Sequence, residues 1–145
     1  MPRLCWALIV GVFALGCSRA PTATVTGTVT LDGQPVSDAS VQLWPKEKLG
    51  LGVYSGRTDA VGRFLLRTRE VPEVKPGEYC ALVSREVKKD GTLPGPGDDW
   101  MALAAPGALR NTLPAIYYNR EHPQFIFDIK PGDNDLPLEL KTPKR

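Results

Sequence analysis

The sequence has few of the residue types that most enzymes rely on. His122 is the only histidine, and Cys5, Cys17 and Cys80 are the only cysteines among 145 residues. Zinc sites take three or four nitrogen, sulfur or carboxylate ligands, and a serine or cysteine nucleophile needs an adjacent base. We therefore expect a protein without a catalytic site, a metal or a cofactor, and place His122 in an exposed turn.

The chain also has little excess charge and no long apolar run. Its 18 basic and 16 acidic residues leave a net charge of +2, and the two signs are interspersed along the sequence. Such a pattern does not favour nucleic acid as a partner. The longest apolar run, 4–15, is shorter than the roughly 20 residues that a membrane-spanning helix needs.

Glycine, proline and alternating apolar residues are abundant instead. The sequence has 14 glycines and 14 prolines, which favours short strands joined by turns. In 24–31, valine, glycine and leucine alternate with threonine, the period of a half-buried strand. Seven segments have strand-like composition: 23–31, 40–44, 53–58, 63–68, 78–84, 125–130 and 136–140. The pattern predicts an all-β sandwich of about seven strands.

Three details of this arrangement can be predicted. Segment 78–84 is apolar on both faces, which indicates a central strand. Residues 85–114 break the pattern and predict a long loop insertion, in which 98–105 would form one or two helical turns capped by Asp98. We expect 131–134 to form a turn rather than part of a calcium site, although Asp133 and Asp135 offer oxygen ligands.

The amino terminus resembles a bacterial lipoprotein signal. Arg3 precedes the apolar run, and Gly16 and Cys17 stand where that signal has its cleavage site and lipidated cysteine. The resemblance implies a leader over 1–16, a lipid on Cys17 and a tether over 17–22. It also implies attachment to a membrane of the cell envelope. By the sorting rule of these lipoproteins, Ser18 after the cysteine is compatible with the outer membrane, where we expect the protein. The alternatives to a lipoprotein signal are an ordinary secretory leader with an incidental cysteine and an uncleaved anchor.

Only Cys80 would remain as a free thiol after these events. A mature chain with one free cysteine cannot form an internal disulfide. Cys80 lies in an apolar strand segment, where we expect it to behave as a small buried hydrophobe.

The rest of the sequence is similar to the carboxypeptidase regulatory-like, or transthyretin-like, β-sandwich family. The residues that carry the resemblance are Gly27-x-Val29 with Leu31-Asp-Gly-x-Pro-Val36, then Thr58-Asp59 with Gly62-x-Phe64, then Pro76-Gly77-x-Tyr79. The resemblance implies a Greek-key domain over 23–141, followed by a polar tail over 142–145. It also implies that the first two long strands lie in different sheets, with 32–39 as a corner, and it implies no reaction.

Exposed aromatic residues are the remaining candidates for ligand contact. The aromatic side chains considered are Trp44, Tyr54, Trp100, Tyr117 and Tyr118. Of these, we select Trp100, Tyr117 and Tyr118 as candidate contacts, Trp100 first because of its place in the long loop. We expect a structural or adhesive lipoprotein that contacts protein or glycan. The alternative is a carbohydrate-binding accessory module of an envelope hydrolase or transport system.

Overall fold

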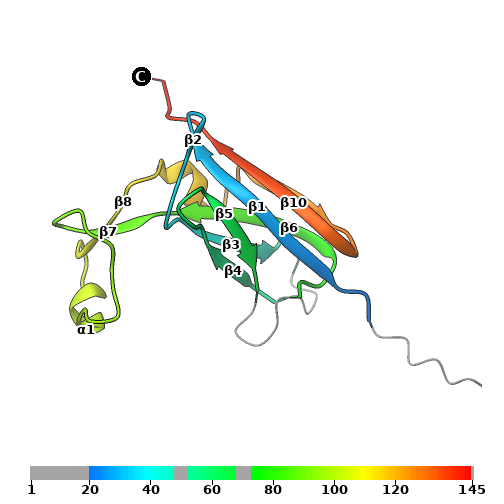
Figure 1. The fold of residues 1–145 in the computed structure, drawn as a ribbon, viewed down its shortest axis with the longest axis horizontal. Coiled ribbons are helices and arrows are strands. Elements are labelled where there is room, and N and C mark those ends of the chain that lie inside the picture. Colours follow the sequence, from blue (N-terminus) through cyan, green and yellow to red (C-terminus); the bar gives the residue numbers. More distant parts are fainter. Residues whose placement is uncertain (1–19, 48–51, 68–72, 145) are drawn as a thin grey trace, which may run out of the picture.

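The computed structural model describes residues 20–47, 52–67 and 73–144, and this part of the chain is all-β with almost no helix. The predicted leader and Cys17 lie outside the described residues. Figure 1 labels most of the elements, which are β1 (Ala23–Leu31), β2 (Gln34–Pro35), β3 (Ser40–Pro45), β4 (Tyr54–Arg57), β5 (Arg63–Leu66), β6 (Gly77–Ser84), β7 (Glu86–Lys88), α1 (Trp100–Leu103), β8 (Leu109–Asn111), the 3-10 helix η1 (Ala115–Tyr118), β9 (Phe125–Ile129) and β10 (Gly132–Leu140).

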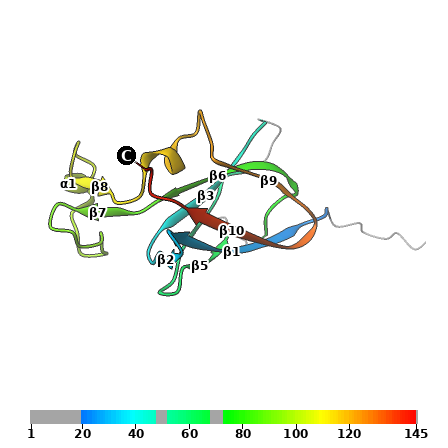
Figure 2. The ribbon, with the colours of Figure 1, turned by 90° about the horizontal axis from the view of Figure 1, so that it is seen from above.

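Two sheets form the body of the molecule. In the first sheet β1 pairs with β10, β2 and β5, and in the second the strand order is β4-β3-β6-β9. Figure 2 shows β1 and β10 on one side and β3, β6 and β9 on the other. The seven predicted strands correspond to β1, β3, β4, β5, β6, β9 and β10. β6 lies between β3 and β9 and is buried over most of its length, so its predicted central place is confirmed.

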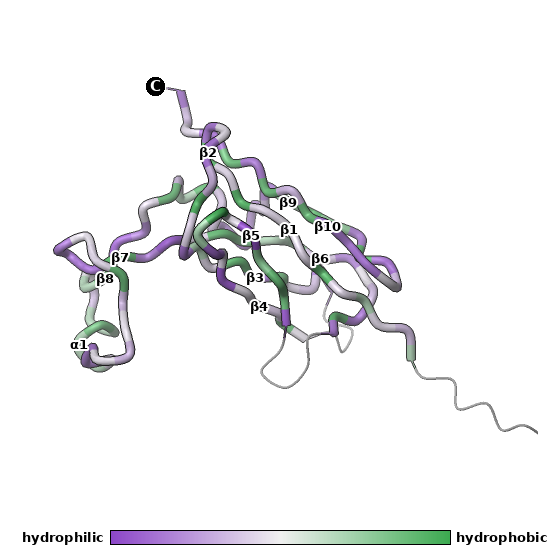
Figure 3. Tube along the Cα trace, viewed as in Figure 1, coloured by the Kyte–Doolittle hydropathy of each residue, from purple (hydrophilic) through white to green (hydrophobic). Residues whose placement is uncertain are grey.

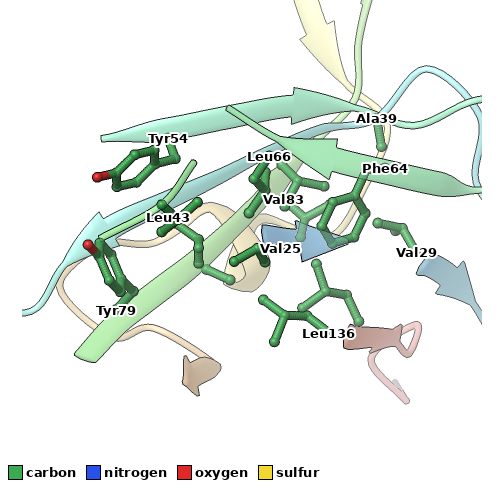
Figure 4. Close-up of a cluster of buried hydrophobic side chains, with 14 of the residues drawn as sticks. Val25, Val29, Ala39, Leu43, Tyr54, Phe64, Leu66, Tyr79, Val83 and Leu136 are labelled. Atoms are coloured by element: carbon green, nitrogen blue, oxygen red, sulfur yellow. The ribbon is translucent and has the colours of Figure 1, made fainter. Parts of the chain in front are cut away.

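The core lies between the two sheets and follows from the alternation along the strands. Val25 and Val29 of β1 are fully buried, and they pack in one cluster with Leu43 of β3 and Val83 of β6. The threonines at 24, 26 and 28, which alternate with the buried residues of β1, are exposed. Figure 4 shows these apolar side chains pointing toward one another from both sheets. The period-two pattern therefore separates core from surface as expected.

Strand β1 pairs with β10 in parallel along its whole length, from Ala23 beside Gly132 to Leu31 beside Leu140. The close contact is at Gly27, where a Cβ atom would lie 2.6 Å from the ring of Phe64 and closer still to the carbonyl oxygen of Leu136. Only glycine leaves room for both neighbours at this position. Gly27 thus permits β5, β1 and β10 to lie together in one sheet.

The corner between the sheets contains a short extra strand. Asp32 and Gly33 have positive φ angles, 51° and 84°, which allow a two-residue hairpin turn. β2 then pairs with the end of β1 before the chain crosses to β3 in the other sheet. The expectation that the first two long strands lie in different sheets is confirmed. The corner 32–39 consists of the turn and β2, followed by a segment that crosses to the second sheet.

The last strand starts earlier than predicted. β10 begins at Gly132, so most of the predicted turn 131–134 is strand. The Asn134 side chain accepts a hydrogen bond from the Lys130 N–H at 3.0 Å and donates one to the Lys130 carbonyl at 2.8 Å, which closes the tighter turn. Asp133 and Asp135 are strand residues paired with β1. The prediction was wrong here because pairing with β1 outweighs the local turn preference of Asp and Asn.

Residues 85–114, here named the arm, contain more structure than the predicted loop. β7 and β8 form a two-stranded antiparallel sheet, and α1 lies between them in the sequence. Figures 1 and 3 show the arm at one end of the molecule, beyond the two sheets, with a mixture of hydrophilic and hydrophobic segments. The helix cap is also corrected, because Asp99 rather than Asp98 accepts hydrogen bonds from the first turn of α1.

Candidate functional site

A groove lies where the arm meets the outer face of the second sheet, and it is here named the arm groove. Its volume is about 160 Å³. Its lining combines two large aromatic side chains with six polar or charged ones. The lining residues are Asp38, Ser40, Gln42, Arg57, Ser84, Glu86, Pro94, Trp100, Leu109 and Tyr118.

The floor of the groove comes from three neighbouring strands. Ser40 of β3 is paired with Arg57 of β4 on one side and with Ser84 of β6 on the other. Because paired residues in a sheet point to the same face, these three side chains form one row. Gln42 lies two residues after Ser40 on the same face of β3. Its Oε1 accepts a hydrogen bond from Trp44 Nε1 at 2.9 Å. The Gln42 amide N–H₂ remains available as a donor.

Asp38 is held at the groove by a buried threonine. Thr58 is 4% exposed, and its hydroxyl accepts a hydrogen bond from the Ala39 N–H at 2.8 Å and donates one to the Val36 carbonyl at 2.7 Å. The Asp38 N–H also donates to the Thr58 carbonyl. These bonds fix the corner residues 36–39 to the end of β4, with Asp38 in a left-handed conformation, φ 57°.

The base of the arm is fixed to the sandwich by Asn111 and Arg85. Asn111 Oδ1 accepts hydrogen bonds from the backbone N–H groups of Arg85 and Leu113, at 3.0 and 3.1 Å. The Arg85 side chain donates through Nε to the Ser37 carbonyl at 2.9 Å. The entry and exit of the arm are therefore joined to each other and to the corner that carries Asp38.

The outer part of the arm is held by an ion pair. Lys88 Nζ lies 2.9 Å from Asp98 Oδ1, and Asp98 Oδ2 accepts a hydrogen bond from the Gly95 N–H. The hydrogen bond from Gly95, followed by that from Lys88, lowers the pKa of Asp98 below its ordinary value. Asp98, predicted to be the helix cap, instead connects β7 to the segment that leads into α1, and so helps place Trp100.

Two of the three candidate aromatic contacts meet in this groove. Trp100 of α1 and Tyr118 of η1 both line it, and they are 61% and 46% exposed. Tyr117 does not reach it: it is 7% exposed, its ring stacks on Phe125, and its hydroxyl bonds to the backbone of Lys141. The selection of Tyr117 was wrong, because η1 turns neighbouring side chains in different directions.

The other two aromatic residues considered have structural environments. Tyr54 is buried and packs edge to face against Tyr79. Trp44 is half-buried, with the guanidinium of Arg120 4.2 Å from its ring centre. Neither lines the arm groove.

Sequence reasoning missed the polar residues of the site. Ser40 and Gln42 alternate with the buried Val41 and Leu43 along β3, so the same pattern that predicts the strand also places them on the outer face. The pattern gives no indication that the arm returns over that face. Arg57, Ser84 and Glu86 have no sequence signal that separates them from ordinary surface residues.

The histidine and the cysteine considered for catalysis do not line the arm groove. His122 is exposed, as predicted, and its backbone N–H bonds to Asn119 Oδ1. Cys80 is buried, also as predicted. It lies on the outer face of β6, with its Sγ 3.5 Å from the Trp44 carbonyl oxygen. Over 20–47, 52–67 and 73–144, no three His, Cys, Asp or Glu side chains gather as a metal site would require. Nor does any helix in those ranges have the length and apolarity to cross a bilayer.

Comparison with known proteins finds distant similarity at the level of structure alone. No protein-family model matches the chain, and no curated protein sequence matches it. Among solved structures, a DUF3823 family protein from Parabacteroides merdae superposes with a TM-score of 0.44 at 19% sequence identity. The match covers 83% of this chain and 46% of that one, so this chain spans less than half the length of its structural neighbour.

Proposed function

We propose that this chain is a non-enzymatic, lipid-anchored lipoprotein of the bacterial cell envelope, with its anchor in the outer membrane. Its transthyretin-like Greek-key sandwich presents the arm groove to a protein or glycan partner. The observation that carries this proposal is the position of the groove: an open, polar and aromatic surface at the end of the domain remote from the start of β1.

The arrangement of the two ends supports a display role. Figures 1 and 2 show the arm at one end of the molecule and the beginning of β1 at the other. Residues 17–22 would connect Cys17 to β1, and an extended segment of this length reaches about 20 Å. A domain tethered so close to the bilayer would hold its far end, with the arm groove, away from the lipid.

The anchor itself is supported by the sequence of the leader. An apolar run preceded by Arg3 and ending at Gly16-Cys17 has the order of a lipoprotein signal. One acyl chain holds a protein weakly, whereas two or three hold it firmly. A cysteine carrying a diacylglyceryl group and an acylated amino group would therefore keep the domain at the membrane.

Two measurements test the anchor. Mass spectrometry of the protein purified from the cells that make it should show a chain that begins at Cys17 and carries lipid. A Cys17→Ser variant should lose the lipid and leave the membrane fraction. Unmodified Cys17 in the wild-type protein would refute the anchor.

The contact role is tested by capturing partners. The mature lipoprotein is cross-linked in whole envelopes and isolated together with bound protein or glycan, in parallel with a Trp100→Ala variant. We expect Trp100→Ala to reduce the captured partner. Met101→Ala is the matched control, because Met101 is 85% exposed on the same helix and does not line the groove. Equal capture by wild type and Trp100→Ala would refute a contact role for the groove.

A further inference from the structure

We infer that the arm groove binds an uncharged saccharide, one sugar ring at a time, an inference that rests on the contact role proposed above. The size of the groove gives the first argument. Pockets for drug-sized ligands have volumes of about 300–1,000 Å³, whereas the arm groove has about 160 Å³. This space suits a single ring at the end or along the edge of a larger glycan.

Most polar side chains of the groove have no hydrogen-bond partner within the described protein and can therefore bond to a ligand. Within the described ranges, the side chains of Asp38, Ser40, Arg57 and Glu86 form no hydrogen bond or ion pair with other residues. The same holds for the hydroxyl of Ser84, a residue only 6% exposed and located on the groove floor. Among the described residues no fully buried side-chain polar atom lacks a partner, so the Ser84 hydroxyl must be open to the groove. It is free to bond to a ligand or to water there.

The combination of donors and acceptors matches a polyol. Carboxylates only accept hydrogen bonds, a guanidinium only donates them, and hydroxyls do both. A sugar ring carries several hydroxyl groups around its edge, and each of these can donate and accept. Asp38 and Glu86 can accept from sugar hydroxyls, while Arg57 and the Gln42 amide can donate to them.

The charge of the groove excludes acidic sugars as the preferred ligand. The lining holds two carboxylates, Asp38 and Glu86, against one guanidinium, Arg57. A ligand carboxylate would add a third negative charge within a few ångströms, and like charges at such distances repel. An uncharged sugar avoids this cost, and its binding should depend little on salt concentration.

The aromatic side chains supply the apolar part of the contact. Trp100 and Tyr118 reach the groove from opposite ends of the segment 100–118, and both are well exposed without a ligand. One face of a sugar ring presents C–H groups, and such a face packs favourably on an aromatic ring. A ring that stacks on Trp100 or Tyr118 would bring its hydroxyl edge toward the polar floor.

The test uses the full mature lipoprotein in lauryldimethylamine oxide, a detergent that has no sugar headgroup. Saturation-transfer NMR and calorimetry measure binding of the methyl glycosides of glucose, galactose, mannose and N-acetylglucosamine, with glucuronic and galacturonic acids as charged counterparts. We expect at least one uncharged glycoside to bind, and its affinity to change less than twofold when the NaCl concentration is raised. Trp100→Ala should weaken that binding about fivefold or more, while Met101→Ala should leave it unchanged.

Four results would overturn the inference: preferred binding of the acids, binding that falls steeply with salt, equal loss in Trp100→Ala and Met101→Ala, or no binding of any glycoside. Failure of the inference remains distinct from failure of the proposed function. If no sugar binds but a protein partner is captured in a Trp100-dependent way, the groove is a protein contact and only the saccharide inference is wrong. If capture does not depend on Trp100, the contact role of the groove is wrong as well.

Discussion

The hydroxyl of Tyr117 forms two hydrogen bonds with the backbone of Lys141, accepting from its N–H at 2.8 Å and donating to its carbonyl at 3.3 Å. These bonds join η1 to the chain just after β10. They also explain why Tyr117 is buried while its neighbour Tyr118 remains at the groove. Tyr117 thus has a structural role and does not line the arm groove.

Tyr117→Phe should therefore lower stability without affecting the groove. The substitution removes both hydrogen bonds but keeps the ring that stacks on Phe125. We expect the free energy of unfolding to fall by about 1–2 kcal/mol, measured by urea denaturation. Partner or sugar binding should remain at the wild-type level, and Tyr118→Phe serves as the control that leaves stability unchanged. A clear loss of binding in Tyr117→Phe would contradict the assignment.

Gly27→Ala should destabilise the fold strongly, although it adds only one methyl group. The added methyl group would meet the Leu136 carbonyl and the ring of Phe64, so β10 or β5 would have to move. We expect a loss of about 3 kcal/mol in the free energy of unfolding. The control is Gly97→Ala in the arm, where no atom lies within 4 Å of the new Cβ. Equal stabilities of the two variants would refute the close parallel packing of β1 and β10.

Thr58→Val should lower both the stability of the protein and binding at the arm groove. Valine keeps the shape of the side chain but cannot bond to the Ala39 N–H, which would be left unsatisfied in a buried place. We expect a loss of about 1–3 kcal/mol in unfolding free energy, together with weaker binding at the groove because Asp38 is less well held. Thr58→Ser retains the hydroxyl and should recover most of both properties. If Thr58→Val binds as well as wild type, Asp38 does not need this support.

The arm should loosen at low pH. Hydrogen bonds from Gly95 and Lys88 lower the pKa of Asp98 below its ordinary value of 3.8. A carboxyl whose pKa is lowered in the folded arm stabilises it at pH values above the ordinary pKa, and this stabilisation is lost as the pH falls through the lowered pKa. We expect the indole N–H resonance of Trp100 to shift toward its random-coil position in this acid range.

The matched variant for this titration is Asp98→Asn, which keeps the shape of the side chain but has no carboxyl to titrate. It should show the loosened Trp100 signal already at neutral pH and little further change on acidification. A Trp100 signal that is independent of both pH and the substitution would show that the ion pair does not position the helix.

The sequence by itself determined the strands and the two faces of each. Alternation in β1 and β3 separates buried valine and leucine from the threonine, serine and glutamine of the outer faces. Asp59 and Gly62 mark a turn that the structure contains. These features are local, because side-chain direction in a strand changes with every residue. They were therefore predictable, as was the central place of β6.

Only the tertiary structure decided which strands pair and which polar residues meet. The parallel pairing of β1 with β10, the early start of β10 and the folding of the arm over β3 and β6 all join segments far apart in the sequence. Such contacts depend on how whole sheets pack, and no local pattern encodes them. The same reason explains why Trp100 and Tyr118 share a groove with Arg57 and Ser84, while Tyr117, next to Tyr118, faces the core.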